Sequence, residues 1–320
     1  MHEIAFCLGS VIVPYDVLFI ALSALVCLFT ALACYTGGGG RGWVLWLLTP
    51  VMWALAYTCA RSIYWACHGE QFSSLSGALT DPGVWGYGLC GVPLGYALTA
   101  RLARLVRLER RPGALTDALA PGLALGLAVL RLGAAFNGGA RGKVLIRESA
   151  LQRLPFAFSD ANGDYRFAAF FAEALLFALF ALVLLAVFCR RTRRQKPGGE
   201  VFRLFLLLYS LAELVIDSTR NDALYFSFNA FISVAQIVAA VTVLVLLVFY
   251  SVRAVRRGWP GRGRWAVWGL YVVSLVTVGV CEYMVQRHGN RQLLCYALMT
   301  LGCVLMFLSV HLAARKSEQR

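Results

Sequence analysis

Hydrophobic residues occur along this chain in long runs that do not alternate with polar positions, which is typical of helices and not of half-buried strands. A transmembrane helix needs about 20 apolar residues to cross a hydrocarbon core of roughly 30 Å. Because runs of this length recur through the whole sequence, the pattern predicts nine transmembrane helices and excludes a β-barrel. The predicted helices cover residues 11–35, 42–66, 84–106, 115–137, 167–189, 201–219, 229–250, 264–286 and 292–313.

The composition indicates the same fold class. Of the 320 residues, 60% are hydrophobic and only 14% are charged, a balance that excludes a soluble globular domain. A segment rich in Gly, Pro and Arg at residues 258–264 separates the last two predicted helices from the others. We therefore expect an all-α polytopic membrane protein, with a seven-helix domain at residues 1–255, an external loop within it at 138–166, and a two-helix extension at 256–320.

Positive charge is concentrated on one side of the predicted bundle. The net charge is +14, and nine spans place the densest basic groups on a single side, which the positive-inside rule makes cytoplasmic. The N-terminus is then outside and the C-terminus cytoplasmic, and the first helix, which no basic segment precedes, is expected to be retained. No aromatic residues interleave with these arginines, which excludes a nucleic-acid partner. The basic groups lie within residues 101–111, 190–196, 253–264 and 315–316.

The ten cysteines form no Cys-x-x-Cys pair, and most of them lie inside predicted helices. This placement is typical of small residues in a membrane core and not of a disulfide framework or a zinc site. We therefore expect neither a metal ion nor a cofactor.

Several predicted helices carry polar side chains at one depth of the membrane. Arg131 lies near the external end of its helix, and a guanidinium at such a position normally faces a partner or a water-filled cavity. A helical rise of about 1.5 Å per residue places polar residues of other helices in the same outer half. These residues are Tyr15, Asp16, Arg61, Cys90, Glu173 and Gln236.

The predicted helix at 201–219 adds a polar stripe. Tyr209, Glu213, Asp217 and Arg220 have the spacing i, i+4, i+8 and i+11, which keeps them on one face. One interpretation is an ion-pair network that only holds the helices together, and the other is a functional polar cavity. We favour the second, because many helices donate polar groups at one level and their desolvation is costly.

Several segments resemble motifs of the bacterial prolipoprotein diacylglyceryl transferase family. Arg131-Leu-Gly followed by Phe136-Asn137-Gly138 and Gly142 is similar to the family's signature, Arg-(Leu/Ile)-Gly-Asn-Phe-x-Asn-Gly-x-x-x-Gly. The resemblance extends over residues 8 to about 250. Further similar segments are Gly9 to Tyr15, Ala60 to Tyr64, Gly91 to Gly95, Glu173, Tyr209 to Arg220, and Ser233 with Gln236.

The resemblance implies a reaction and its partners. Enzymes of this family are multi-pass proteins of the bacterial plasma membrane. They move the diacylglyceryl unit of phosphatidylglycerol onto the thiol of a lipobox cysteine in a preprolipoprotein and release glycerol phosphate. The implied partners are thus phosphatidylglycerol or another anionic phospholipid and a preprolipoprotein signal peptide. Such chemistry needs a cation for the phosphate and a base for the thiol.

On this resemblance we predict three catalytic residues. Arg131 and Arg220 bind the lipid phosphate, and Asp217 acts as the base or orients an arginine. Cys90 is either a nucleophile that holds the lipid transiently or an inert cysteine. The residues predicted to bind substrate are Tyr15, Arg61, Asn137, Gly138, Gly142, Glu173, Tyr209, Glu213 and Gln236.

The chain departs from the family pattern at five positions. Cys90 stands where the family has a loop histidine, and Ala134 where the signature has asparagine. Glu213 stands where the family's pattern for the helix from Tyr209 to Arg220 has arginine. Gly139 and Asp217 stand at positions of glutamate. Because a missing histidine weakens thiol activation, the alternative function is that of a catalytically diverged relative, which binds or carries a lipid or amphiphile in the same outer-leaflet cavity.

Overall fold

The computed structural model describes most of the chain. Gly138 and Gly139 lie outside the described residues, and so do the side chains of Asp16 and Asn137. The described ranges are 4–8, 11–68, 74–80, 88–109, 111–137, 142–147, 149–159, 163–196, 198–225, 232–288 and 291–318.

The described parts contain nine helices of 14 or more residues, which confirms the predicted all-α polytopic class. Seven of them are long and apolar enough to cross a membrane. These seven are α1 (Tyr15–Gly37), α2 (Gly42–Cys67), α5 (Pro112–Asn137), α7 (Ala169–Arg193), α9 (Val234–Val255), α10 (Gly261–His288) and α11 (Gln292–Glu318). The other two are α4 (Val92–Leu105) and α8 (Glu200–Thr219), and three single-turn or short elements are α3 (Leu75–Thr80), η2 (Leu89–Gly91) and α6 (Ser149–Gln152).

The helices α4 and α8 differ from the seven for separate reasons. The 14 residues of α4 reach only about 21 Å at the helical rise per residue, which is less than the hydrocarbon thickness. In contrast, α8 has 20 residues but includes Glu200, Arg203, Glu213 and Asp217, which lower its hydropathy. Both segments are helical as predicted, but neither is a fully apolar span.

The first predicted helix begins later than the hydrophobic run indicated. Strand β1 (Ile4–Leu8) pairs antiparallel with β2 (Val11–Pro14), and α1 starts only at Tyr15. The β-branched run at 11–13 favours a strand, and Pro14, with an extended backbone, is the last residue before the helix. The prediction that the helix starts at residue 11 is therefore wrong by about one turn.

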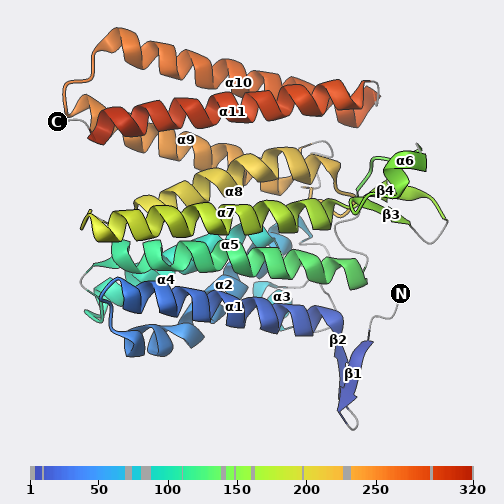
Figure 1. Ribbon diagram of the computed structural model, residues 1–320, viewed down its shortest axis with the longest axis horizontal. Coiled ribbons are helices and arrows are strands. Elements are labelled where there is room, and N and C mark those ends of the chain that lie inside the picture. Colours follow the sequence, from blue (N-terminus) through green and yellow to red (C-terminus); the bar gives the residue numbers. More distant parts are fainter. Residues whose placement is uncertain are drawn as a thin grey trace. The chain divides into compact units, whose positions relative to one another are not determined.

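The chain divides into two compact units. The first comprises residues Met1–Trp65, Phe72–Phe205 and Thr219–Asp222. Within it α5 packs against both α1 and α7, as Figure 1 shows. Close contact between α1 and α5 depends on small residues, because a Cβ at Gly122 or Gly126 would meet the backbone of α1. The hydroxyl of Ser23 also donates to the carbonyl of Gly126 at 2.8 Å.

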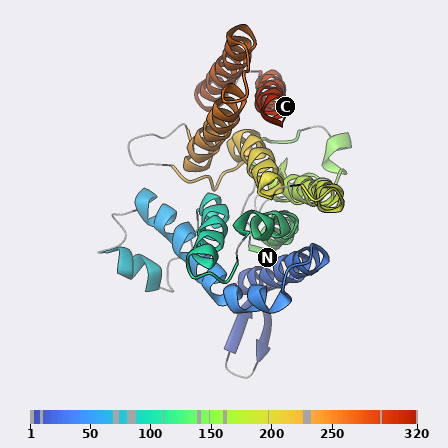
Figure 2. The same cartoon turned by 90° about the vertical axis from the view of Figure 1, so that its left-hand side faces the viewer.

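The second unit contains residues 206–218 of α8 together with α9, α10 and α11. Figure 2 shows α10 and α11 side by side. Met299 and Met306 of α11 and Val243 and Leu247 of α9 are fully buried in one hydrophobic core of this unit. The two final helices thus share a core with α8 and α9, and the domain boundary at residue 255 stays a prediction.

The external loop predicted at 138–166 contains strands in its described parts. Strand β3 (Ala157–Ser159) pairs antiparallel with β4 (Tyr165–Phe167). The segment 142–146 pairs with β4 on its other side, because the amide of Gly142 donates to the carbonyl of Phe167 at 2.8 Å. These pairings hold the chain that follows α5 next to the start of α7.

Candidate functional site

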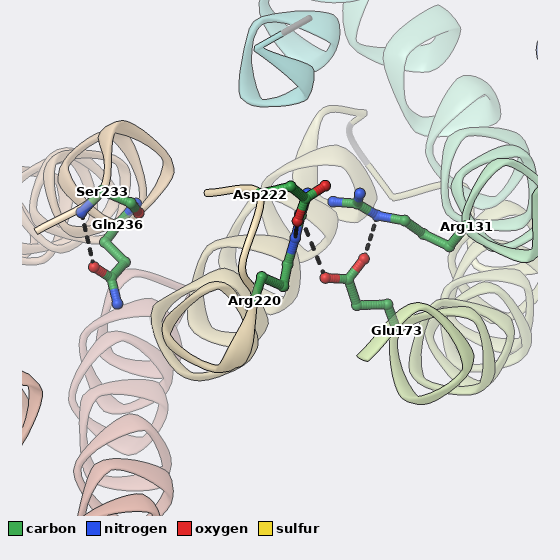
Figure 3. Close-up of polar contacts among 6 residues, drawn as sticks. All are labelled: Arg131, Glu173, Arg220, Asp222, Ser233 and Gln236. Atoms are coloured by element: carbon green, nitrogen blue, oxygen red, sulfur yellow. Dashed lines mark hydrogen bonds and ion pairs between the residues drawn. The ribbon is translucent and has the colours of Figure 1, made fainter. Parts of the chain in front are cut away.

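Two arginines from distant parts of the first unit contact one carboxylate (Figure 3). Glu173 of α7 lies between them. Its Oε2 forms an ion pair with Nε of Arg131 on α5, and its Oε1 lies 3.5 Å from Nη1 of Arg220. The side chains of Glu173, Arg131 and Arg220 are 1%, 7% and 10% exposed. The structure therefore brings three of the predicted site residues together in a buried position.

A fourth charged residue completes this cluster, and sequence reasoning missed it. Nε and Nη2 of Arg220 donate to the two carboxylate oxygens of Asp222, at 2.9 and 3.0 Å. The Asp222 side chain is 42% exposed, in contrast to Glu173. Because Asp222 lies outside the helix, no periodicity of the sequence indicated it. The four side chains carry two positive and two negative charges.

The backbone around Gly142 sets the position of Arg220. Gly142 and Arg220 form an antiparallel bridge, and the amide of Lys143 donates to the carbonyl of Thr219 at 2.6 Å. A Cβ at Gly142 would overlap with the carbonyl oxygen of Phe167. Gly142 is thus a positioning residue, because only glycine permits this close approach of three chain segments.

Tyr15, the first residue of α1, contacts the end of α5 that carries Arg131. Its ring stacks on that of Phe136, with centroids 4.4 Å apart and planes 16° apart. Phe19 of α1 stacks on the same ring at 5.3 Å. The aromatic side chains thereby fix the start of α1 against the signature segment of α5.

Arg61 and Cys90 occupy neighbouring elements of the first unit. The side chain of Arg61 is 1% exposed, and its guanidinium lies 5.8 Å from the centre of the Tyr64 ring. Cys90 is half-buried in η2, which contacts α2 closely: a Cβ at Gly91 would come within 2.8 Å of the Cys59 carbonyl. Cys90 therefore lies on an element that packs against the helix of Arg61.

The remaining predicted residues belong to the second unit. Tyr209, Glu213 and Asp217 are at most 5% exposed, so the polar stripe of α8 is turned inward. Gln236 has a structural role at the start of α9: its Oε1 accepts from the amide of Ser233, whose hydroxyl accepts from the amide of Gln236. Nε2 of Gln236 also donates to the carbonyl of Leu214 on α8, at 3.2 Å. A contact of Gln236 with substrate stays a prediction.

The charged groups of the described cluster are guanidinium and carboxylate groups that contact one another. Among the residues that the structure describes, no group of three His, Cys, Asp or Glu side chains is arranged to hold a metal ion. In the buried cluster the groups able to bind a ligand are the guanidinium forks, which match the oxygens of a carboxylate or phosphate in paired hydrogen bonds.

Comparisons with known proteins all point to one family. A family profile described as prolipoprotein diacylglyceryl transferase matches residues 3–252. The chain is 30% identical over 209 residues to the phosphatidylglycerol–prolipoprotein diacylglyceryl transferase of Synechococcus elongatus, which is 62% of this chain and 70% of that one. It is 30% identical over 138 residues to the protein of that name from Tropheryma whipplei, 42% and 51% of the two chains, and 26% identical over 204 residues to that of Clostridium novyi, 61% and 75%. The chain spans about half the length of several of the curated relatives that it matches.

Proposed function

Since this chain belongs to the prolipoprotein diacylglyceryl transferase family, we propose that it transfers the diacylglyceryl unit of phosphatidylglycerol to a lipobox cysteine of a preprolipoprotein signal peptide. The protein is a multi-pass membrane protein, and we place it in the bacterial plasma membrane. Both substrates are embedded in lipid, which fits an enzyme whose candidate site lies among apolar helices.

The observation that supports this proposal best is the convergence of Arg131 and Arg220 on Glu173. Two guanidinium groups that reach the two oxygens of one carboxylate are also close enough to reach two oxygens of one phosphate. In a buried site their attraction for an anion is weakly screened by water. We therefore assign Arg131 and Arg220 to the phosphate of phosphatidylglycerol.

The proposed reaction is a displacement at the glyceryl carbon that carries the phosphate. The thiolate of the lipobox cysteine forms a new C–S bond, and the C–O bond to the phosphate breaks, which releases glycerol phosphate. The two arginines stabilise the charge that develops on the leaving phosphate. The thiol proton passes to a base because a thiol with a pKa near 8.5 is mostly protonated at neutral pH. We propose Asp217 as that base or as the residue that orients an arginine.

A second candidate function is a diverged relative that binds or carries a lipid or amphiphile without this chemistry. The observation that favours it is Cys90, which stands at the position of the family's histidine. The four histidines of the chain are His2, His68, His288 and His311, and none of them lies in the matching segment. A carrier would use the same anion-binding cluster but leave the lipid intact.

A direct assay separates the two functions. The purified protein is incubated with phosphatidylglycerol and a lipobox peptide, and the peptide is examined by mass spectrometry for a diacylglyceryl adduct. We expect an adduct with the wild-type protein and its loss with Arg131→Ala. Arg153→Ala is the matched control, because Arg153 is exposed and lies on the same predicted side. Absence of an adduct beside an active relative would contradict the transferase proposal and leave the carrier.

A further inference from the structure

Asp222 holds Arg220 by the same geometry that a phosphate would use. Nε and Nη2 of Arg220 donate in parallel to the two oxygens of Asp222, at 2.9 and 3.0 Å. This paired contact is the arrangement in which a guanidinium binds carboxylate and phosphate alike. In Figure 3 Asp222 and Glu173 approach the Arg220 guanidinium from different sides. A phosphate that binds Nε and Nη2 of Arg220 must therefore take the place of Asp222.

The two acidic partners of Arg220 differ in how easily they can leave. Glu173 is 1% exposed on a membrane-spanning helix and pairs with both Arg131 and Arg220, so its removal would break two buried ion pairs. Asp222 is 42% exposed and follows the end of α8. An exposed carboxylate regains its hydration when it moves away, so Asp222 costs less to separate from Arg220 than the buried Glu173 does. Asp222 is thus the replaceable partner and Glu173 the fixed one.

We propose that Asp222 is an internal competitor for the lipid phosphate, which occupies the paired donors of Arg220 in the lipid-free protein and is displaced when a phosphate binds. This inference rests on one premise of the proposed function, namely that a phosphate binds Arg220. Asp222 thereby sets the affinity of the site for its anion. Because Asp222 competes through its negative charge, we expect an anionic ligand to displace it and a neutral ligand not to do so.

The proposal predicts the sign of a substitution effect. The apparent affinity of a ligand falls by the fraction of protein that is competent to bind it. If Arg220 is released from Asp222 about one-tenth of the time, removal of the competing charge tightens binding roughly tenfold. A residue that merely positions Arg220 would act in the opposite direction, because its loss would loosen the guanidinium and weaken binding.

The test is a titration of the purified full-length protein in detergent with short-chain phosphatidylglycerol and, separately, with glycerol phosphate. We expect Asp222→Asn to tighten binding about 3- to 10-fold. Asp222→Glu keeps the charge and should bind like the wild type. Asp164→Asn is the matched control, since it removes one exposed negative charge from the same predicted side and should change binding less than about 2-fold. Thermal unfolding of each variant establishes that it is folded.

The two ligands and the transfer assay separate the possible outcomes. Tighter binding of the lipid, of glycerol phosphate or of both supports displacement and says whether the substrate, the released product or each of them competes with Asp222. Unchanged or weaker binding of both ligands to Asp222→Asn overturns the inference. Tighter binding without any diacylglyceryl adduct would support the competitor but contradict the transferase, so that the two proposals fail separately.

Discussion

Gly142 and Arg220 face each other in an antiparallel backbone bridge, which joins the chain after α5 to the chain after α8. Arg131 lies near the end of α5, so this bridge sets how close the two candidate phosphate-binding arginines can come. The sequence motif that contains Arg131 and Gly142 thus has two physical functions. Its arginine supplies a charge, and its glycine supplies the close backbone approach that brings the second arginine to the first.

Gly142→Ala should therefore impair the site without removing any charged group. The added methyl group overlaps with the Phe167 carbonyl, so the backbone must shift at the residue that faces Arg220. We expect a loss of about 1–3 kcal/mol of stability and at least a tenfold loss of transfer activity, measured by thermal unfolding and by the adduct assay. Gly269→Ala on α10 is the control, because nothing lies within 4 Å of its added Cβ. Equal behaviour of the two variants would contradict the positioning role.

Glu173→Gln should destabilise the protein in a way that an anionic lipid reverses. The substitution removes the negative charge shared by Arg131 and Arg220, and breaking a buried pair costs about 3–5 kcal/mol. A bound phosphate restores a negative charge there, so phosphatidylglycerol should raise the melting temperature of the variant more than that of the wild type. In Glu200→Gln, which loses a 3.3 Å pair with Arg203, the lipid should have no such extra effect. An equal lipid effect on Glu173→Gln and wild type would place the phosphate elsewhere.

The helices were predictable because a long apolar run is a cumulative property of the sequence. A long apolar run predicts a helix whatever its neighbours are, and the helical rise then gives the level of each polar residue. The strand at 11–14 was not predictable in this way, since a β-branched apolar run is compatible with either structure. It takes the strand form where it pairs with β1.

The partners within the site were less accessible to sequence reasoning. Depth placed Arg131 and Glu173 at one level, but only the packing of α5 against α7 makes them a pair. Asp222 follows a helix end and belongs to no motif, so its contact with Arg220 depends on the local backbone. Gln236 was predicted as a substrate contact from its motif, whereas both ends of its amide bind backbone groups.

Asp117→Ala should destabilise α8 and leave the chemistry intact. The Asp117 carboxylate accepts hydrogen bonds from the amides of Gly199 and Phe202, at 2.7 and 2.9 Å, and thereby caps the start of α8. Loss of a cap costs about 1–2 kcal/mol, which thermal unfolding should detect. Thr116→Ala is the control, because its hydroxyl donates to the carbonyl of Gly113 within its own helix, so its loss should cost less. A loss of activity in Asp117→Ala protein that remains fully folded would contradict a purely structural role.

Gln236→Ala and Ser233→Ala distinguish a cap from a substrate contact. Gln236→Ala removes the acceptor of the Ser233 amide, and Ser233→Ala removes the acceptor of the Gln236 amide. Each variant therefore loses one of the two reciprocal hydrogen bonds at the start of α9 and should lose about 1–2 kcal/mol of stability. If Gln236 acts only in this way, the two variants have equal transfer activity per folded molecule. A further loss that is specific to Gln236→Ala, seen as a raised KM for phosphatidylglycerol, would instead support the predicted contact with substrate.

Cys90 decides between the two candidate functions most directly. Cys90→Ser should leave most of the transfer activity, because we expect the half-buried Cys90 to act as a small packing residue and not as a nucleophile. Cys90→His introduces the side chain that the family has at this position, and an imidazole with a pKa near 6.5 can accept a thiol proton at neutral pH. We expect the histidine variant to form the diacylglyceryl adduct at least tenfold faster than the wild type, in the range of general-base effects.

Loss of adduct formation in Cys90→Ser would instead make Cys90 the nucleophile. No adduct from wild type or Cys90→His, with phosphatidylglycerol still bound, would favour the carrier, since a restored base would then have no transfer reaction to accelerate.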